Sequence, residues 1–293
     1  MQPLQFHGPS AVRRQPPLAH YNNGLLTPNQ RERLEVVLVS PRNPLNIGAA
    51  ARAMANFGLS HLAVVDQYAP PWREAKSAVG APELLRAARE TVALSDAVGA
   101  CTLVIGTGSL TYRKPEQPVV ELPNLAPMVE RELARGGRVV IVFGSEKHGM
   151  TREDLSICHC IAVIPTHEGQ PSMNLGQAVA VCLYEIAARS SRTEMPATAS
   201  GNCREAGPEE SGPESDLSAT SGNLDILSGL VQEVMNAAGY SPRSMQAANR
   251  HDLHLMLRRM TMSALDTRRA LGLFRRVLWR LRHSAGSGGN RPA

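Results

Sequence analysis

Between Leu34 and Arg189, short apolar runs rich in β-branched residues alternate with segments of helical pattern, and this alternation limits the possible folds more than any other feature. Five runs are mainly apolar on both faces, as expected of strands buried on both sides: LEVVLVS, HLAVVD, TLVIGTG, RVVIVFG and CIAVIP. Helical patterns separate them: NIGAAARAMANFG, PELLRAARE, TVALSDAVG, LAPMVERELARGG, TREDLSIC and a closing NLGQAVAVCLYEIAAR. Together they predict an α/β domain with a parallel sheet covered by helices on both faces.

The rest of the chain divides by composition into four further segments. Residues 1–33 are rich in Pro, Asn, Gln and Arg without periodicity and are predicted to be a disordered extension of the 34–189 domain. Residues 190–222 hold Ser, Gly, Pro and Glu and read as a flexible linker. Residues 223–283 return to a helical pattern, and residues 284–293 are predicted to be a disordered tail.

Positive charge is concentrated in the helical segment. Ten arginines and two aspartates lie between Arg243 and His283, whereas the whole chain has a net charge of only +5. The arginines at positions 268, 275 and 282 repeat every seven residues, away from an apolar stripe formed by Leu271, Phe274, Leu278 and Leu281. The pattern indicates a polyanion partner for this end, with a solvated helix face as the alternative.

Composition also bears on where the chain resides. No stretch reaches the run of about 18 apolar residues that a membrane span needs. The first 20 residues carry Pro and polar residues where a secretion signal would need an apolar run. Five cysteines form no paired framework and suit a reducing compartment. We expect a cytoplasmic protein with no membrane partner.

Four strand ends carry glycine or small polar residues, and ligands of parallel sheets bind beyond such ends. The segments are SPRNPLNIG, GTGSLTYR, FGSEKHGM and IPTHEGQPSMN. GTGSLT is not a dinucleotide fingerprint, because Thr111 stands where the third glycine should be, and the chain has no Walker loop. A dinucleotide dehydrogenase is therefore poorly supported.

Three of these segments resemble the motifs of the SpoU–TrmH branch of the SPOUT RNA methyltransferases. They are NIGAAARA, FGSEKHGM and IPTHEGQPSMNLGQAVAV, in the order and at the spacing of the family. The similarity runs from Leu34 to Arg189, and YSPRSMQAANRHDLHLMLRRM resembles the helical extension of TrmJ-type members. Each motif alone is weak, whereas three in series are a strong signal.

The resemblance implies a fold that periodicity does not predict: a C-terminal trefoil knot within the sheet, although chains are in general unknotted. It implies S-adenosylmethionine as cofactor, a homodimer whose two subunits complete the site, and no metal. The cofactor contacts implied by position are Thr107, Gly108, Ser109, Gly144, Ile164, Pro171, Ser172 and Met173.

The same resemblance assigns catalytic roles to Arg52, Asn46, Glu146, Ser172 and Asn174. Arginine is a poor base because its pKa exceeds about 12, so we expect Arg52 to stabilise the alkoxide that develops on a ribose and to bind an adjacent phosphate. Whether it also takes the proton stays open. For Asn46 and Asn174 the alternative is simple helix capping, and Glu146 is expected in a hydrogen-bonded, partly buried position.

Two local sequence features need an interpretation. Ser145 stands where TrmJ-type members often have an arginine, with Lys147 two residues on. Cys158, His159 and Cys160 invite a zinc interpretation, but they enter a strand, whose alternation sends neighbouring side chains to opposite faces. No second pair has zinc spacing, so a buried structural role is favoured.

The sequence thus predicts an enzyme that methylates a ribose 2′-hydroxyl of tRNA, with the first nucleotide of the anticodon loop (position 32, cytidine or uridine) implied as its target. The arginines expected to contact RNA phosphates are Arg258, Arg259, Arg268, Arg269, Arg275 and Arg276. Two alternatives stay open: the same reaction on ribosomal RNA, and a non-catalytic RNA-binding protein of this fold.

Overall fold

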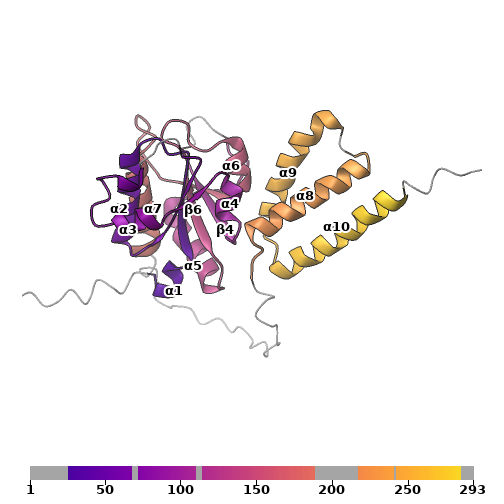
Figure 1. Ribbon diagram of the computed structural model, residues 1–293, viewed down its shortest axis with the longest axis horizontal. Coiled ribbons are helices and arrows are strands. Elements are labelled where there is room, and N and C mark those ends of the chain that lie inside the picture. The colour runs from indigo at the N-terminus through magenta and orange to yellow at the C-terminus, as the bar shows by residue number, and fades with distance from the viewer. Residues whose placement is uncertain (1–25, 68–71, 110–113, 189–216, 241, 285–293) are drawn as a thin grey trace, which may run out of the picture.

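The computed structural model describes residues 26–67, 72–109, 114–188, 217–240 and 242–284, which form an α/β domain and a helical tail beside it (Figure 1). Within these residues, seven strands form one sheet in the order β3-β2-β1-β6-β4-β7-β5. Every neighbouring pair is parallel, as predicted. The strands are β1 (Leu34–Val39), β2 (His61–Val65), β3 (Arg89–Thr91), β4 (Leu103–Thr107), β5 (Val119–Glu121), β6 (Val139–Phe143) and β7 (Cys160–Val163).

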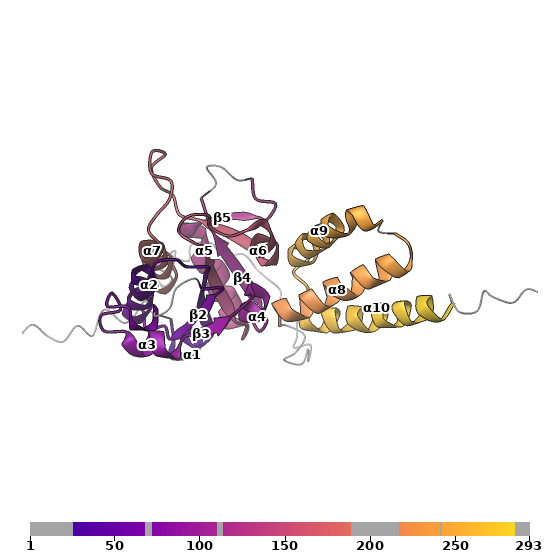
Figure 2. The same ribbon diagram turned by 45° about the horizontal axis from the view of Figure 1, so that its top comes forward.

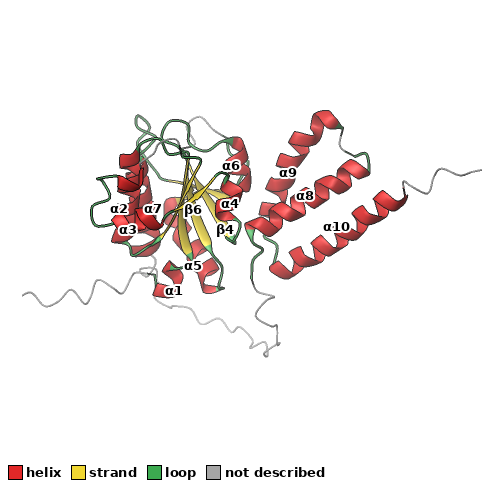
Figure 3. Cartoon of the chain, in the orientation of Figure 1, coloured by secondary structure: helices red, strands yellow, loops and turns green. Residues whose placement is uncertain are grey.

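Helices cover both faces of the sheet, and Figure 3 shows the strands lying between them. The domain's helices are α1 (Pro28–Arg31), α2 (Pro44–Asn56), α3 (Pro82–Ala87), α4 (Leu94–Val98), α5 (Leu125–Ala134), α6 (Arg152–Ile157) and α7 (Leu175–Ala188), with 3-10 turns η1 (Trp72–Glu74) and η2 (Leu122–Asn124). Side chains of β1 alternate between two cores: Val36 and Leu38 face α2 and α7, while Val37 and Val39 face α4 and α6. Burial on both faces explains the continuous apolar strands.

Two strands were not predicted, and both lie at the edges of the sheet. β3 and β5 have three residues each. β3 reads Arg-Glu-Thr and β5 reads Val-Val-Glu, so neither carries an apolar run of the length seen in the other strands. The segment predicted as helical from Thr91 to Gly99 forms α4 only over Leu94–Val98. Short polar edge strands are held by backbone pairing with a neighbour and leave little periodic signal.

The predicted N-terminal disorder is wrong for residues 26–33. Thr27 and Gln30 form a capping box around α1, and Leu26 is buried. Arg33 continues into the sheet, because its carbonyl accepts a hydrogen bond from the amide of Val139. Residues 1–25 lie outside the described part of the chain.

The tail contains α8 (Ser221–Ala237), η4 (Arg243–Met245), α9 (Gln246–Arg259) and α10 (Ala264–Ser284). Figure 2 shows α8 and α9 beside α4 and α6, and α10 running along α8 on the side away from α9. The tail's own core joins Leu227, Leu253, Leu257 and Leu271. No helix in the described ranges is both long and apolar enough to cross a membrane.

The predicted linker is wrong for its last residues. The amide of Ser221 donates to the carbonyl of Cys101 at 2.7 Å, and that of Gly222 donates to the carbonyl of Gly99 at 2.9 Å. The helical tail therefore starts within residues 217–222 and is held against the α/β domain from its first turn. The predictions of a linker over residues 190–216 and of a tail over residues 285–293 concern parts of the chain outside the described residues.

Candidate functional site

A cavity of about 290 Å³ opens at the carboxyl edge of the sheet, where β4, β6 and β7 end and α7 begins. This volume lies near the lower end of the range for small-molecule sites, about 300–1,000 Å³. All eight positions to which the sequence assigned cofactor contacts line it: Thr107, Gly108, Ser109, Gly144, Ile164, Pro171, Ser172 and Met173. Segments that are more than 60 residues apart in the chain thus converge on one space, because parallel strands end at a common edge.

One wall of the cavity is a tight turn after β6. Ser145 and Gly149 exchange two backbone hydrogen bonds, of 3.3 and 2.8 Å, and the buried Ser145 hydroxyl accepts from the amide of His148. A side chain on Gly144 would place its Cβ 2.2 Å from the carbonyl carbon of Gly149. The turn therefore requires glycine at 144, and Ser145 closes it in the place where TrmJ-type members often have arginine.

Glu146, at the tip of this turn, connects the first two motifs. Its carboxylate accepts hydrogen bonds from the backbone amides of Arg42 (3.0 Å) and Asn43 (3.2 Å) and from Nδ2 of Asn46 (2.8 Å). Desolvation raises the pKa of Glu146, but these hydrogen bonds outweigh it and leave the pKa below its ordinary value. The carboxylate lines the cavity as an anion; it is hydrogen-bonded as expected but more exposed than expected.

Asn174 connects the third motif to the same group. Its Nδ2 donates to Oδ1 of Asn46 at 2.8 Å, while its Oδ1 accepts from the amide of Gly176 at 2.9 Å. Asn174 therefore both caps the start of α7 and supports the site. Asn46 is not the cap of its helix: Asn43 is the N-cap of α2 and accepts from the amide of Leu45. The capping alternative for Asn46 is thus wrong.

Of the five predicted catalytic residues, Glu146 and Ser172 line the cavity, Asn46 and Asn174 are joined to Glu146 by hydrogen bonds, and Arg52 lies apart from both groups. It lies on the exposed side of α2, six residues beyond Asn46 and hence roughly 9 Å further along the helix. Gly176 of α7 packs so closely on α2 that a Cβ there would lie 2.6 Å from the Cβ of Ala49. Leu45 on α2 and Tyr184 on α7 remain 56% and 48% exposed. Arg52 thus belongs to an exposed α2–α7 surface.

Comparison with known proteins identifies the family of the α/β domain. A profile of the SpoU rRNA Methylase family matches residues 33–184, about half of the chain. The chain belongs to this SpoU family. The matched residues contain all three motifs, the whole sheet and every residue lining the cavity.

Among the curated relatives of the SpoU-family chain is the tRNA (cytidine/uridine/adenosine-2'-O-)-methyltransferase TrmJ of Pseudomonas aeruginosa, which is 39% identical over 156 residues. This match covers 53% of the chain and only 60% of the relative. The tRNA (cytidine-2'-O-)-methyltransferase TrmJ of Methanocaldococcus jannaschii is 34% identical, over 55% of the chain and 70% of the relative. The crystal structure of TrmJ from Z. mobilis ZM4 is similar with a TM-score of 0.67 at 26% identity, over 83% of this chain and 98% of that one.

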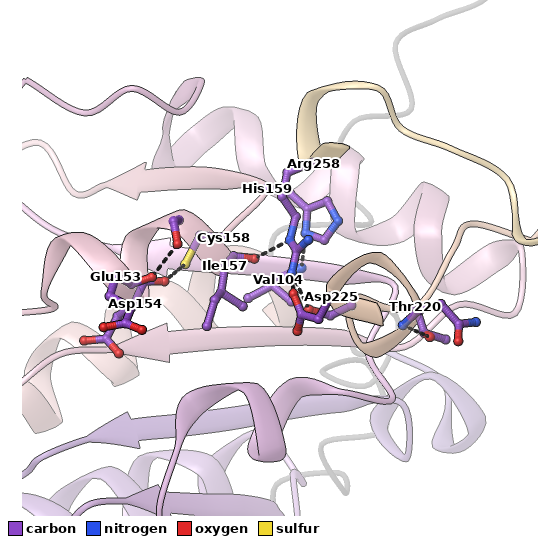
Figure 4. A network of polar contacts seen from close by, with 12 residues as sticks. Val104, Glu153, Asp154, Ile157, Cys158, His159, Thr220, Asp225 and Arg258 are labelled. Carbon is purple, nitrogen blue, oxygen red and sulfur yellow. Dashed lines mark hydrogen bonds and ion pairs between the residues drawn. The ribbon is translucent and has the colours of Figure 1, made fainter. Parts of the chain in front are cut away.

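Arg258, one of the arginines predicted to contact RNA in the SpoU-family chain, has a different role. Its side chain is 1% exposed and ties α9 to the α/β domain (Figure 4). It donates to the carbonyl of Ile157 (2.9 Å), to the hydroxyl of Ser221 (3.1 Å) and to the carboxylate of Asp225 (2.6 Å). A guanidinium enclosed in this way is withdrawn from RNA phosphates, so the prediction for Arg258 is wrong.

The neighbouring Cys-His-Cys sequence is structural. Cys158, which ends α6 before the strand begins, and Cys160, the first residue of β7, lie in the two different cores of the sheet. Nδ1 of His159 accepts a hydrogen bond from the amide of Val104 at 3.0 Å. Desolvation, with a smaller effect of Arg258, lowers the pKa of His159 to about 3, so the ring is neutral. In the described ranges, no group of three or more His, Cys, Asp or Glu side chains is placed to hold a metal ion.

The other arginines of the tail lie on its surface. Arg259 is exposed at the end of α9, and Arg268, Arg269, Arg275 and Arg276 are exposed on α10. The apolar stripe predicted for this helix faces inward, with Leu271 and Leu278 buried. Sequence reasoning missed Lys147, His148 and Thr166, which also line the cavity. They lie within or next to the recognised motifs, so counting every polar residue of these loops could have found them.

Proposed function

We propose that the chain transfers a methyl group from S-adenosylmethionine to a ribose 2′-hydroxyl of tRNA. The observation that carries this proposal is the convergence of eight predicted cofactor positions and Glu146 on one cavity. The relatives from Pseudomonas aeruginosa and Methanocaldococcus jannaschii are tRNA 2′-O-methyltransferases, which supports tRNA as the substrate.

The cavity suits this cofactor chemically. S-adenosylmethionine supplies a methyl group on a positively charged sulfur and also carries an ammonium group, an apolar chain and an adenine. Phe143, Met150 and Leu175 provide apolar lining, the ends of β4 and β7 present backbone groups, and the ionised Glu146 provides negative charge. Lys147 and His148 line the same wall, where their side chains could bind a carboxylate or a phosphate.

Arg52 serves the ribose in a dimer, in our proposal. It is exposed on α2, outside the cavity of its own subunit, and Leu45 on the same helix and Tyr184 on the adjacent α7 are exposed apolar side chains. A second copy packed on this surface would cover these side chains and bring Arg52 to the cavity of the partner. There the guanidinium stabilises the developing alkoxide and binds the adjacent phosphate.

The tail positions the RNA. The arginines of α9 and α10 bind phosphates, which gives affinity without sequence information, whereas the reacting 2′-hydroxyl itself distinguishes RNA from DNA. We propose the first nucleotide of the anticodon loop, position 32, as the target, with cytidine or uridine as the base. The trefoil knot and the cytoplasmic location are parts of the same proposal.

The proposal is tested with the purified chain, labelled S-adenosylmethionine, and separate tRNA and ribosomal RNA. We expect methyl incorporation into tRNA, mapped by mass spectrometry to a ribose at position 32. Arg52→Ala should abolish incorporation while tRNA binding persists. Incorporation into ribosomal RNA alone would favour the alternative that the family description names. Binding of tRNA without any affinity for S-adenosylmethionine in calorimetry would indicate a non-catalytic binder.

A further inference from the structure

The last two turns of α10 carry an exposed tryptophan surrounded by basic side chains. Trp279 is 56% exposed, although a tryptophan usually buries most of its large apolar surface. It lies outside the buried stripe of Leu271 and Leu278, so it contributes little to holding the tail together. Its exposed indole is therefore available to bind a partner.

One face of the Trp279 indole is already stacked. The ring of His283, one turn later, lies 4.4 Å from it between centroids at an interplanar angle of 26°, and Nδ1 of His283 lies 2.8 Å from the carbonyl of Trp279. The contact fixes the indole as a flat, oriented surface. Arg275 and Arg276 lie four and three residues before Trp279 and hence on the same side of α10.

The preceding turns leave room and supply charge. A Cβ on Gly272, two turns before Trp279, would meet no atom within 4 Å, so the helix surface there is open. Arg275 and Arg276 are exposed between the two positions. Arg282, one turn after Trp279, is held by Glu233 of α8 at 2.7 Å. The whole of α10 carries six arginines and a single aspartate, so this surface is complementary to an anion with a flat apolar part.

We infer that Trp279 is a stacking platform for an unpaired base of RNA, with Arg275 and Arg276 binding the flanking phosphates. A base in a single strand exposes its aromatic face, whereas a base in a duplex is covered by its neighbours. The inference rests on the proposed RNA substrate and deepens it: the tail selects unpaired nucleotides. Because the C-terminal end of α10 points away from the α/β domain (Figure 1), the base stacked on Trp279 is a different one from the nucleotide that is methylated.

The chain offers a direct optical test, because it has only two tryptophans. Trp72 is 2% exposed inside the α/β domain, so a ligand at the tail changes the emission of Trp279. The full-length protein is titrated, without cofactor, with a seven-nucleotide unpaired RNA and with a duplex of the same length. We expect saturable quenching by the unpaired RNA, little quenching by the duplex, and none in Trp279→Phe.

Affinity is then measured with a dye-labelled copy of the unpaired RNA. Trp279→Ala should weaken binding about tenfold, in line with the usual contribution of one stacked base, while Trp279→Phe retains most of it. Arg275→Gln should weaken binding and reduce its salt dependence without changing the quenching at saturation. An unchanged melting temperature of Trp279→Ala would confirm that the exposed ring is not needed for folding.

Equal quenching by duplex and unpaired RNA would overturn the inference, as would unchanged affinity in Trp279→Ala. A response of Trp279 to anionic lipid vesicles but not to RNA would assign the surface to a membrane instead. The test involves no methyl transfer. A chain that binds unpaired RNA through Trp279 but does not methylate tRNA would overturn the proposed function alone, and the reverse result would overturn this inference alone.

Discussion

Nδ2 of Asn174 donates a hydrogen bond to Oδ1 of Asn46 at 2.8 Å, although 128 residues separate the two in the chain. Asn46 in turn donates a hydrogen bond through its own Nδ2 to the carboxylate of Glu146. The three sequence motifs are thus joined by a continuous chain of side-chain hydrogen bonds at the rim of the cavity. This arrangement makes each amide a positioning group for the carboxylate that lines the cavity.

Asn46→Ala should lower methyl transfer about tenfold to a hundredfold, because hydrogen bonds to a charged group contribute about 1.5–3 kcal/mol. The loss should fall mainly on kcat, since Asn46 does not itself line the cavity. Asn56→Ala, at the exposed end of the same helix, is the matched control and should leave activity unchanged. Equal effects of the two substitutions would contradict the role of Asn46.

Glu146→Gln should change the dependence of stability on pH. The pKa of the folded carboxyl lies below the ordinary 4.5, so its ionisation stabilises the fold above pH 4.5, and this contribution is lost as the pH falls through the folded pKa. Thermal unfolding of both proteins between pH 3 and 8 should therefore show a wild-type advantage at neutral pH that shrinks below pH 4.5. An advantage that grows on acidification would have the wrong sign.

Gly144→Ala should abolish S-adenosylmethionine binding in calorimetry, because the new Cβ would overlap the backbone of Gly149 and Met150 and displace the cavity wall. Gly229→Ala is the matched control: its Cβ would meet nothing within 4 Å in the middle of α8. It should bind the cofactor normally and gain up to about 1 kcal/mol in stability. Normal cofactor binding by Gly144→Ala would show that the cofactor lies elsewhere.

The adjacent residues Arg258 and Arg259 should behave differently when each is replaced by methionine. Arg258→Met leaves Asp225 without its partner at the junction of tail and α/β domain, and should cost about 3–5 kcal/mol in denaturant unfolding. Arg259 is exposed, so Arg259→Met should change stability by less than about 0.5 kcal/mol. Instead it should weaken RNA binding and lower the salt slope by about one. The opposite assignment of the two effects would contradict the structure.

Mixed dimers test whether Arg52 acts across subunits. Arg52→Ala and Gly144→Ala are each expected to be inactive alone. Co-expression of the two variants should restore activity, because each heterodimer then has one intact cavity facing one intact Arg52. If the subunits pair at random, half of the dimers are heterodimers and each has one working site of two, so turnover should approach a quarter of the wild-type value. A persistently inactive mixture of folded dimers would place both residues in the same subunit's site.

The order along the chain of the five apolar strands, the long helices between them and the three motifs was determined by the sequence alone, because burial on both faces forces continuous apolar strands and because glycine and small polar residues mark the ligand edge. The eight positions that the resemblance assigned to the cofactor all line the cavity at this edge of the sheet. Patterns of this kind involve residues that are close together in the chain, so they can be recognised from the sequence.

Tertiary structure decided the rest. Arg258 and Arg259 are neighbours of the same type, and only the packing of α9 against α6 encloses the first and exposes the second. β3 and β5 exist because a neighbouring strand offers backbone hydrogen bonds, and residues 26–33 and 217–222 are ordered by contacts with distant segments. Arg52 lies away from the cavity because Asn46 and Arg52 occupy different turns of α2. Such outcomes depend on contacts between segments far apart in the chain, which no local pattern records.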